Sequence, residues 1–344
     1  MSMINEQKIV ISLDCMGGDF GPKETVRGAA LAIESYEGPS NLEIVLVGKT
    51  SEITQYMDTV NKKGLTIVQA NEKINDDEHP IEAMRKKRDS SIVVATSLVK
   101  SGKCDAMVSM GSTGASMAAS VMILGLLDGL ERPCIGGTFL GLAPNTVLMD
   151  MGSNIDCRPN LLLSFGLIGS VFAEKFLNIK NAKIGLLSVG SEPAKGNKQV
   201  QESYKIFEQS GLNFVGNVEG MDFFTGKADV IVCDGFVGNI LLKFAEGMGT
   251  VLRTFLKKNL ALTLPDHDID DLVGELWTET NLARSMGGPL FGVKSPVVLG
   301  HGSCVSHEIA GAIVSAVKLV ETDMVAGLEI ALSSLFVHSN DELK

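Results

Sequence analysis

Six glycine-containing segments of this sequence carry the side chains whose types could do chemistry. Asp, Asn, Lys and His stand beside glycines, and glycines leave backbone N–H groups accessible. That combination suits the binding of an anion and the stabilisation of an oxyanion, although short turns also need glycine. The segments are GGDFGP (17–22), GSTG (111–114), GSN (152–154), GSEPAKGN (190–197), DGFVGN (234–239) and GHGS (300–303).

The segment GSTG precedes a helix that we expect over residues 115–127, so its N–H groups and the positive helix end could hold phosphate. A plain N-cap by Ser112 or Thr113 is the alternative. The substrate- and phosphate-binding residues that we predict are Asp14, Gly17, Gly18, Gly111, Ser112, Thr113, Gly114 and Asn154.

Four further residues are candidates for catalysis. Lys195 places a cation in a strand-to-helix loop where an anionic group could be met, and a solvated lysine is the alternative. The Asn239 amide could donate to a developing oxyanion, and a helix cap is the alternative. His301 stands between two glycines, which an ordinary turn would also explain, and Asp234 could orient the other groups.

Several common catalytic motifs are absent. No segment reads GxGxxG, GxSxG or HExxH, and residues 190–198 fail the P-loop pattern in length and in the residue after the lysine. No two cysteines are close enough for a CxxC pair, and the histidines do not cluster. We therefore expect neither a metal nor a cofactor, and we disfavour a covalent serine enzyme.

The composition is that of a globular protein and not of a nucleic-acid binder. The chain has 344 residues, 45% of them hydrophobic, and a net charge of −11, which lacks the basic excess that phosphate neutralisation needs. The N-terminus lacks a secretory signal, so we expect a cytoplasmic location. The apolar stretches Met117–Leu127 and Leu161–Ala173 are shorter than a membrane span.

Short β-rich runs alternate with segments of helical period, which predicts an α/β fold with a doubly wound, mostly parallel sheet. We expect one two-lobed domain over residues 8–338, with residues 265–288 irregular. The carboxyl ends of parallel strands share an edge, so the six segments should converge on one crevice. The expected strands are 8–14, 42–47, 65–70, 105–109, 146–150, 183–189, 228–233 and 296–299, and the expected helices are 23–35, 91–100, 115–127, 160–177, 197–209, 238–258 and 305–320.

Nine motifs in series closely resemble the bacterial phosphate acyltransferase family (PlsX). They extend from about residue 9 to residue 320, so that the resemblance covers nearly the whole chain. The motifs are LDCMGGDFGP (13–22), RKKRDSS (85–91), SMGSTGA (109–115), LMDMGSNIDCRP (148–159), GLLSVGSEPAKGN (185–197), GNVEGMDF (216–223), ADVIVCDGFVGN (228–239), MGGPLFGVKSPV (286–297) and HGS (301–303).

The resemblance implies an enzyme that moves a fatty acyl group from acyl carrier protein to inorganic phosphate, giving acyl phosphate for a downstream glycerol-3-phosphate acyltransferase in phospholipid synthesis. It also implies a Rossmann-like fold similar to phosphotransacetylase and isopropylmalate dehydrogenase, a homodimer and a peripheral membrane location. Three residues depart from the family pattern: Cys15 stands for Ala, Ser112 for Asn and Cys304 for Ser. The Ser112 change leaves a backbone role at that position untouched.

Applied to this chemistry, the candidate residues take roles in positioning phosphate and stabilising a tetrahedral intermediate. Lys195 would bind phosphate or neutralise the oxyanion, and Asn239 would polarise the thioester carbonyl. The alternatives are a phosphotransacetylase-like enzyme that uses coenzyme A, a non-catalytic scaffold that recruits acyl carrier protein to the membrane and, by fold analogy only, an NAD-dependent dehydrogenase.

Two further segments suggest partners. The basic run Arg85, Lys86, Lys87 and Arg88 could dock an acidic carrier protein, and a solvated face is the alternative. Within 238–258, apolar residues recur on one helical face beside Lys243, Arg253, Lys257 and Lys258. We interpret the first half of this helix as core and expect the second half, from about Thr250 to Leu264, to face a bilayer or an acyl chain.

Overall fold

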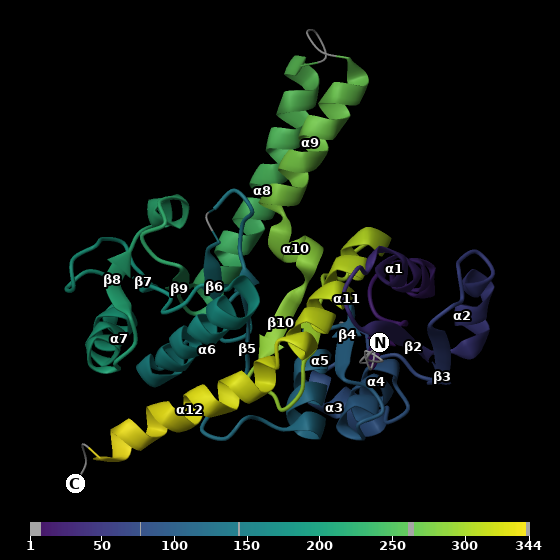
Figure 1. Cartoon of the computed structure of the whole chain (residues 1–344), viewed down its shortest axis with the longest axis horizontal. Helices are drawn as coiled ribbons and strands as arrows, with labels where there is room; N and C mark the ends of the chain where they lie inside the picture. Colours follow the sequence, from purple (N-terminus) through teal and green to yellow (C-terminus); the bar gives the residue numbers. More distant parts are fainter. Residues whose placement is uncertain (1–7, 76, 144, 261–264, 342–344) are drawn as a thin grey trace, which may run out of the picture. The chain divides into compact units, whose positions relative to one another are not determined.

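The computed structural model describes residues 8–75, 77–143, 145–260 and 265–341. Its internal contacts divide the chain into two compact units (Figure 1): unit 1 is Met1–Asp128 with Arg284–Glu329, and unit 2 is Gly129–Ala283 with Ile330–Lys344. Each unit holds strands and covering helices, which confirms the α/β class. A single domain over 8–338 stays a prediction.

Unit 1 contains a six-stranded part of the sheet with the order β3-β2-β1-β4-β11-β10. Neighbouring strands are parallel except β10 and β11, which are antiparallel. The strands are β1 (Lys8–Asp14), β2 (Asn41–Gly48), β3 (Leu65–Gln69), β4 (Ala106–Ser109), β10 (Gly288–Phe291) and β11 (Val297–Leu299).

Helices cover both faces of β1, which explains why its consecutive residues Ile11 to Asp14 are all buried. The Ser12 hydroxyl donates to the Ala95 carbonyl of α4, while α1 and α11 pack on each other and contact β1 as well. The helices are α1 (Pro22–Ser35), α2 (Thr50–Met57), α3 (Pro80–Lys86), α4 (Ser91–Lys100), α5 (Thr113–Ala119) with a π-helical turn (Ser120–Leu124), α10 (Leu282–Met286), α11 (Ser306–Glu321) and α12 (Met324–Asp341), of which α10 and α12 cross the unit boundary.

Unit 2 contains five strands in the order β5-β6-β9-β7-β8, parallel except that β5 runs antiparallel to β6. Alternate residues of β6 serve opposite faces: Leu148 packs in the cluster that includes Leu241 of α8, and Met149 lies against Gly169 of α6. The elements are β5 (Cys134–Thr138), β6 (Val147–Met149), α6 (Pro159–Leu177), β7 (Ile184–Leu187), α7 (Lys198–Gln209), β8 (Phe214–Val218), a 3-10 helix (Gly220–Phe224), β9 (Val230–Val232), α8 (Gly235–Leu260) and α9 (Asp266–Thr280).

Residues 265–288, expected to be irregular, form α9, α10 and the start of β10, so that prediction was wrong. Acidic residues suit the N-terminal turns of a helix. The buried stripe of α9 is narrow, with Ile269, Val273 and Thr280 on one side. Figure 1 shows α9 side by side with α8. Gly249 of α8 allows this approach, because a β-carbon there would meet the Thr280 hydroxyl at 2.5 Å.

The helix α6 is longer than its apolar stretch indicates. With 19 residues it meets the length and composition of a membrane span, the one helix to do so in the described part of the chain. The prediction that this stretch is too short was therefore wrong in length. However, α6 packs against β5, β6, β9 and α7, and most of its apolar residues are buried in those contacts.

Candidate active site

Three of the predicted segments meet in unit 1, where β1, β4 and β11 end. A β-carbon on Gly17 would lie 2.6 Å from the backbone nitrogen of Gly111, and one on Gly18 would lie 2.9 Å from the Gly302 carbonyl oxygen. The Asp19 N–H donates to that same oxygen over 2.8 Å. The three segments therefore form one loop cluster at the carboxyl edge of parallel strands.

The carboxylate of Asp14 holds this cluster and is completely buried. Its Oδ1 accepts the N–H groups of Met16 and Gly17 at 3.2 Å, and its Oδ2 accepts the Ser109 hydroxyl at 2.8 Å. Ser109 in turn accepts the N–H of Gly111 at 3.0 Å. Burial raises the pKa of Asp14 above its ordinary value, against hydrogen bonds that lower it. The N–H groups of Gly17 and Gly111 are thus occupied within the loops.

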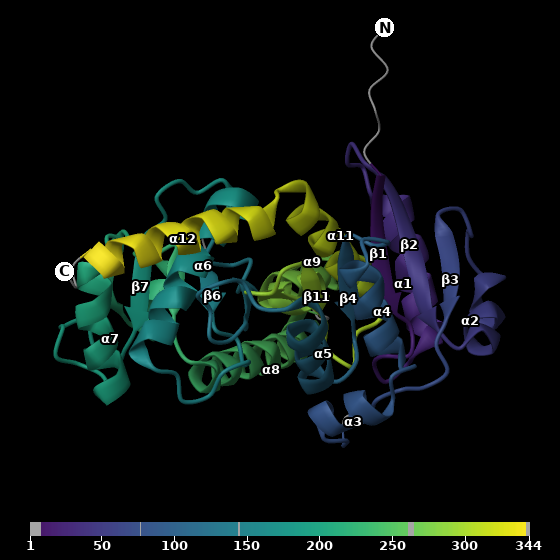
Figure 2. The same cartoon turned by 90° about the horizontal axis from the view of Figure 1, so that it is seen from below.

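Ser112 is the N-cap of α5, since its hydroxyl accepts the Ala115 N–H at 3.4 Å. The capping interpretation of this residue is therefore confirmed. Thr113 and Gly114 begin the helix and are exposed. A β-carbon on Gly114 would lie 2.9 Å from Cγ of Pro80, the first residue of α3, and Figure 2 shows α3 beside α5.

His301 is exposed, and its ring folds back on its own loop. The Ser303 N–H donates to Nδ1 over 3.3 Å, and the Ser303 hydroxyl lies 2.9 Å from the same atom. Because Nδ1 accepts, the neutral ring assigned from these contacts carries its proton on Nε2. Sequence reasoning missed the support of this loop: Arg284 donates to the Ser303 carbonyl at 3.1 Å and pairs with the buried Glu308.

In unit 2, Asp150 organises the GSN segment, a role that sequence reasoning also missed. Its carboxylate accepts the N–H groups of Gly152 and Ser153 at 3.0 Å, the N–H of Asn154 at 2.8 Å and the Asn154 side-chain amide at 2.9 Å. Burial raises the pKa of Asp150. Asn154 is itself buried and also donates to the Pro133 carbonyl. Asn154 therefore serves the loop structure, and the signal that could have found Asp150 is its position at a strand end, like that of Asp14.

The helix α8 begins at Gly235, three residues earlier than predicted, and Asp234 caps it by accepting the Val237 N–H at 2.9 Å. Asn239 lies in the first turns and not at the cap, so its capping alternative was wrong. Its side chain is exposed and makes no hydrogen bond with any residue that the structure describes. A β-carbon on Gly238 would lie 1.8 Å from the Asp150 carbonyl oxygen, so that only glycine lets α8 approach the loop this closely.

Lys195 is exposed in the loop between β7 and α7. Its backbone N–H donates to the Glu192 carbonyl at 3.0 Å, and the Asn217 amide holds that same carbonyl at 2.8 Å. Asn197 caps α7 by accepting the Val200 N–H. The Lys195 ammonium has no ion-pair or hydrogen-bond partner among residues 8–341 as far as they are described. The loop is therefore ordered while its cation stays available to an anion.

The six glycine-containing segments are divided between the two units. Those at 17–22, 111–114 and 300–303 belong to unit 1, and those at 152–154, 190–197 and 234–239 belong to unit 2. Within unit 2, the Gly235 N–H donates to the Asn154 carbonyl at 2.7 Å, so the GSN and DGFVGN segments are in contact. The single crevice remains a prediction.

The lysines of the basic run at 85–88 are paired with nearby glutamates, and its arginines are exposed. Lys87 donates to the Lys73 carbonyl and pairs with Glu78, and Lys86 lies 3.5 Å from Glu82 in the same helix. Arg85 and Arg88 are exposed and have no ion pair in the described part of the chain. The expectation of four available cations was therefore wrong for Lys87, whose ammonium is already used locally.

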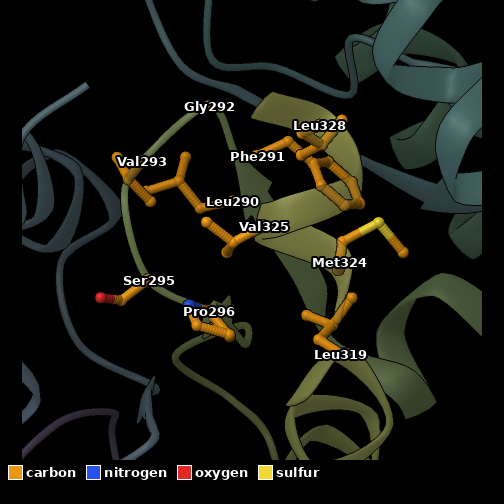
Figure 3. A pocket seen from close by; sticks show the side chains of 10 residues that line it. All are labelled: Leu290, Phe291, Gly292, Val293, Ser295, Pro296, Leu319, Met324, Val325 and Leu328. Atoms are coloured by element: carbon orange, nitrogen blue, oxygen red, sulfur yellow. The ribbon is translucent and has the colours of Figure 1, made fainter. Parts of the chain in front are cut away.

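The cavity in Figure 3 lies in unit 1 and has a volume of ≈ 10 Å³, room for about one water molecule. It cannot hold phosphate or an acyl chain. Its lining is Leu290, Phe291, Gly292, Val293, Ser295, Pro296, Leu319, Met324, Val325 and Leu328.

All six cysteines are buried and carry free thiols. Burial raises the pKa of Cys104 to about 11 and that of Cys157 to about 12. Since the thiolate is the nucleophile, these thiols are inert at neutral pH. No group of three His, Cys, Asp or Glu side chains in the described residues is arranged to hold a metal ion.

Comparisons with known proteins agree with the motif series. Residues 9–326 match the family described as "Fatty acid synthesis protein". The chain is 41% identical over 323 residues to the phosphate acyltransferase of Thermoanaerobacterium thermosaccharolyticum, covering 93% of this chain and 95% of that protein. It is 42% identical over 331 residues to the phosphate acyltransferase of Desulforamulus reducens, covering 95% and 98%.

The fold is also similar to a solved phosphotransacetylase from Streptococcus pyogenes, with a TM-score of 0.59 and 18% identity over 91% of this chain and 94% of that one. This likeness confirms the expected fold. The family match and the two relatives described above show that the chain belongs to the bacterial phosphate acyltransferase family (PlsX) and is a transferase.

Proposed function

We propose that this enzyme transfers a fatty acyl group from acyl carrier protein to inorganic phosphate, and that the acyl phosphate released supplies a downstream glycerol-3-phosphate acyltransferase. The observation that carries the proposal is the identity of 41% and 42% to phosphate acyltransferases across nearly the whole chain. We place the reaction in the cytoplasm at the membrane surface, because the product is amphipathic.

The reaction needs no acylated side chain. Phosphate is partly dianionic at neutral pH, by analogy with phosphorylated side chains, so one of its oxygens attacks the thioester carbonyl directly. A tetrahedral oxyanion forms, collapses to acyl phosphate and expels the carrier's thiolate, which takes up a proton. The burial of all six thiols supports this direct route, since none is available as a nucleophile.

Asn239 polarises the thioester carbonyl and stabilises the oxyanion. Its exposed amide, with no partner among the described residues, is an N–H donor held in advance by the glycine contacts of α8 with the GSN loop. Lys195 offers a positive charge to phosphate or to the oxyanion. Asp234 acts through Asn239, because it fixes the first turn of α8.

In unit 1, phosphate binds to the first N–H groups of α5, at Thr113 and Gly114, together with Gly18. Gly17, Gly111 and Asp14 shape that cradle by their mutual hydrogen bonds. His301 lies on the neighbouring loop at 300–303, where its Nδ1 accepts the Ser303 N–H. Asn154 belongs to the support of the other loops.

Arg85 and Arg88 dock the acidic carrier protein. Arg85 lies in the last turn of α3, and Arg88 follows that helix. Pro80, the first residue of α3, lies against Gly114 of the phosphate cradle. The position of α3 within unit 1 favours delivery of the acyl group beside the bound phosphate.

The second half of α8, from about Thr250 to Leu260, anchors the protein to a membrane or forms the contact between the two subunits of the expected homodimer. Val251 and Phe255 are exposed on this half. Of the nearby cations, Lys257 pairs with Asp270, and Arg253 lies over the Trp277 ring at 5.6 Å, which leaves Lys258 as the cation for an anionic surface. Residues 261–264 of the segment expected to face the bilayer lie outside the described residues.

The test is to incubate the purified protein with fatty-acylated acyl carrier protein and phosphate. Acyl phosphate is then trapped as a hydroxamate with hydroxylamine. Phosphate-dependent hydroxamate is expected. Turnover with acyl-coenzyme A alone would favour the phosphotransacetylase-like alternative, and carrier binding without turnover would favour a scaffold.

A further inference from the structure

The first half of α8, from Gly235 to about Gly249, carries an exposed apolar stripe that begins in the turn before Asn239. Phe236, Ile240 and Phe244 are 56%, 52% and 65% exposed. Their spacing of four residues places them on one side of the helix. The interpretation of this half as a core helix is therefore wrong for the side that carries the stripe.

This stripe is not needed to build the core of unit 2. The inward side of the same helix is supplied by Val237, Leu241 and Ala245, which pack against the core cluster that contains Leu148 and Ile231. A helix on the surface of a soluble protein normally has a polar outer side. Exposed apolar surface that continues from a polar site indicates a binding surface.

The stripe passes beside Asn239. Phe236, three residues before Asn239, lies next to it on the helix surface, and Ile240 and Phe244 continue the stripe along the neighbouring side, while the run from Phe236 to Phe244 rises by about 12 Å along the axis. Lys243, which borders the stripe, is neutralised by Glu246 at 2.9 Å. An apolar chain that leaves a carbonyl at Asn239 thus meets three large apolar side chains and no unpaired cation along this length of the described helix.

We propose that Phe236, Ile240 and Phe244 form the track that binds the fatty acyl chain of the substrate and sets the preference for long chains. The proposal rests on the proposed function, in which Asn239 holds the thioester carbonyl. The acyl chain is the occupant because it is covalently attached to that carbonyl and must begin beside the Asn239 amide. Burial of its methylenes against the stripe contributes to binding in proportion to the apolar area covered.

The test compares butyryl-, octanoyl- and palmitoyl-carrier protein as substrates for the wild type and for the variants Ile240→Ser and Phe244→Ser. Each variant should lose about 10-fold in kcat/KM with the palmitoyl substrate and less than about 2-fold with the butyryl substrate. The control is Leu272→Ser, at an exposed apolar position of α9, which should leave all three values unchanged. In parallel, a photoreactive palmitoyl group should cross-link to residues 236–244 of the wild type.

Equal losses with all three substrates, or cross-links that fall elsewhere, would overturn the acyl track. A change of oligomeric mass in the two variants without a chain-length effect would assign the stripe to a second copy of the chain instead. If the wild type turns over no carrier substrate of any length, the proposed function itself fails. If it turns over all of them and the variants keep its chain-length profile, only the track fails.

Discussion

The side chain of Asn239 lies directly against Gly152: a β-carbon on Gly152 would approach Cβ of Asn239 to 3.2 Å. Gly152 has a φ of 135°, and its N–H is held by the buried Asp150 carboxylate. The amide that we assign to the oxyanion is therefore placed by a loop that the carboxylate fixes, and not by a hydrogen bond of its own. Such preorganised donors contribute most to catalysis when they need no rearrangement.

Loss of the oxyanion donor in Asn239→Ala should reduce kcat by about 100- to 1000-fold. Asn239→Asp should reduce kcat further, because its carboxylate adds a negative charge where one develops. Both variants should keep the wild-type melting temperature, since Asp234 caps α8. The measurements are hydroxamate formation and thermal unfolding. Equal small activity losses with lowered melting temperatures would point to a structural role.

Lys195→Ala should leave the fold intact and remove one charge-assisted contact of about 1.5–3 kcal/mol, or about 10- to 150-fold in rate if the contact exists only in the transition state. Lys198→Ala is the matched control, because its exposed ammonium lies 3.7 Å from Glu202 and is not assigned to the site. Steady-state kinetics at saturating phosphate decide the matter, and an unchanged rate for Lys195→Ala excludes the assignment.

Arg85→Glu should raise the KM for acyl carrier protein substrate and flatten its salt dependence, because a steering charge is reversed. Lys63→Glu makes the same change of net charge at another exposed position of unit 1 and should leave both quantities unaltered. The initial rate is measured across a salt series. An identical salt response in the two variants would contradict docking at α3.

Phe255→Glu should release the protein from anionic vesicles in a flotation assay while activity with soluble carrier substrate persists. Phe255 is 60% exposed, so the charge should be tolerated by the fold. Ile330→Glu, at another exposed apolar position, is the control and should float like the wild type. Continued flotation of the folded Phe255→Glu variant would remove this part of α8 as the anchor.

Asp14→Asn should change the pH dependence of stability. Burial raises the pKa of Asp14 above 3.8, so the folded state retains the proton more strongly than the unfolded state. Stability from this group is present below pH 3.8 and is lost as the pH rises through the raised pKa. The free energy of unfolding of the wild type, relative to Asp14→Asn, should therefore fall from pH 4 to pH 7 in urea titrations. A difference that is constant or rises with pH would show that hydrogen bonding dominates over burial.

The sequence by itself determined the α/β class, the mostly parallel sheet and the family. The first two follow from the alternation of strand and helix patterns and the third from nine ordered motifs, and all of these are local features of the chain. It also identified Ser112 as a possible cap, since a cap is read from neighbouring residues. It did not predict α9, whose acidic residues hide the stripe of Ile269 and Val273 that buries the helix.

Only the tertiary structure decided how the candidate residues are supported and which are available. Lys87 and Arg88 look alike in sequence, but a loop that folds back brings Glu78 to Lys87 alone. The sequence offered Asp14 as one of several binding candidates and did not indicate Asp150, because the amide groups that the two carboxylates hold converge only after the strands pair. Phe244 and Ala245 are consecutive, yet one faces solvent and the other the core. Which side of an apolar helix is covered depends on what packs against it, and that is a property of the whole fold.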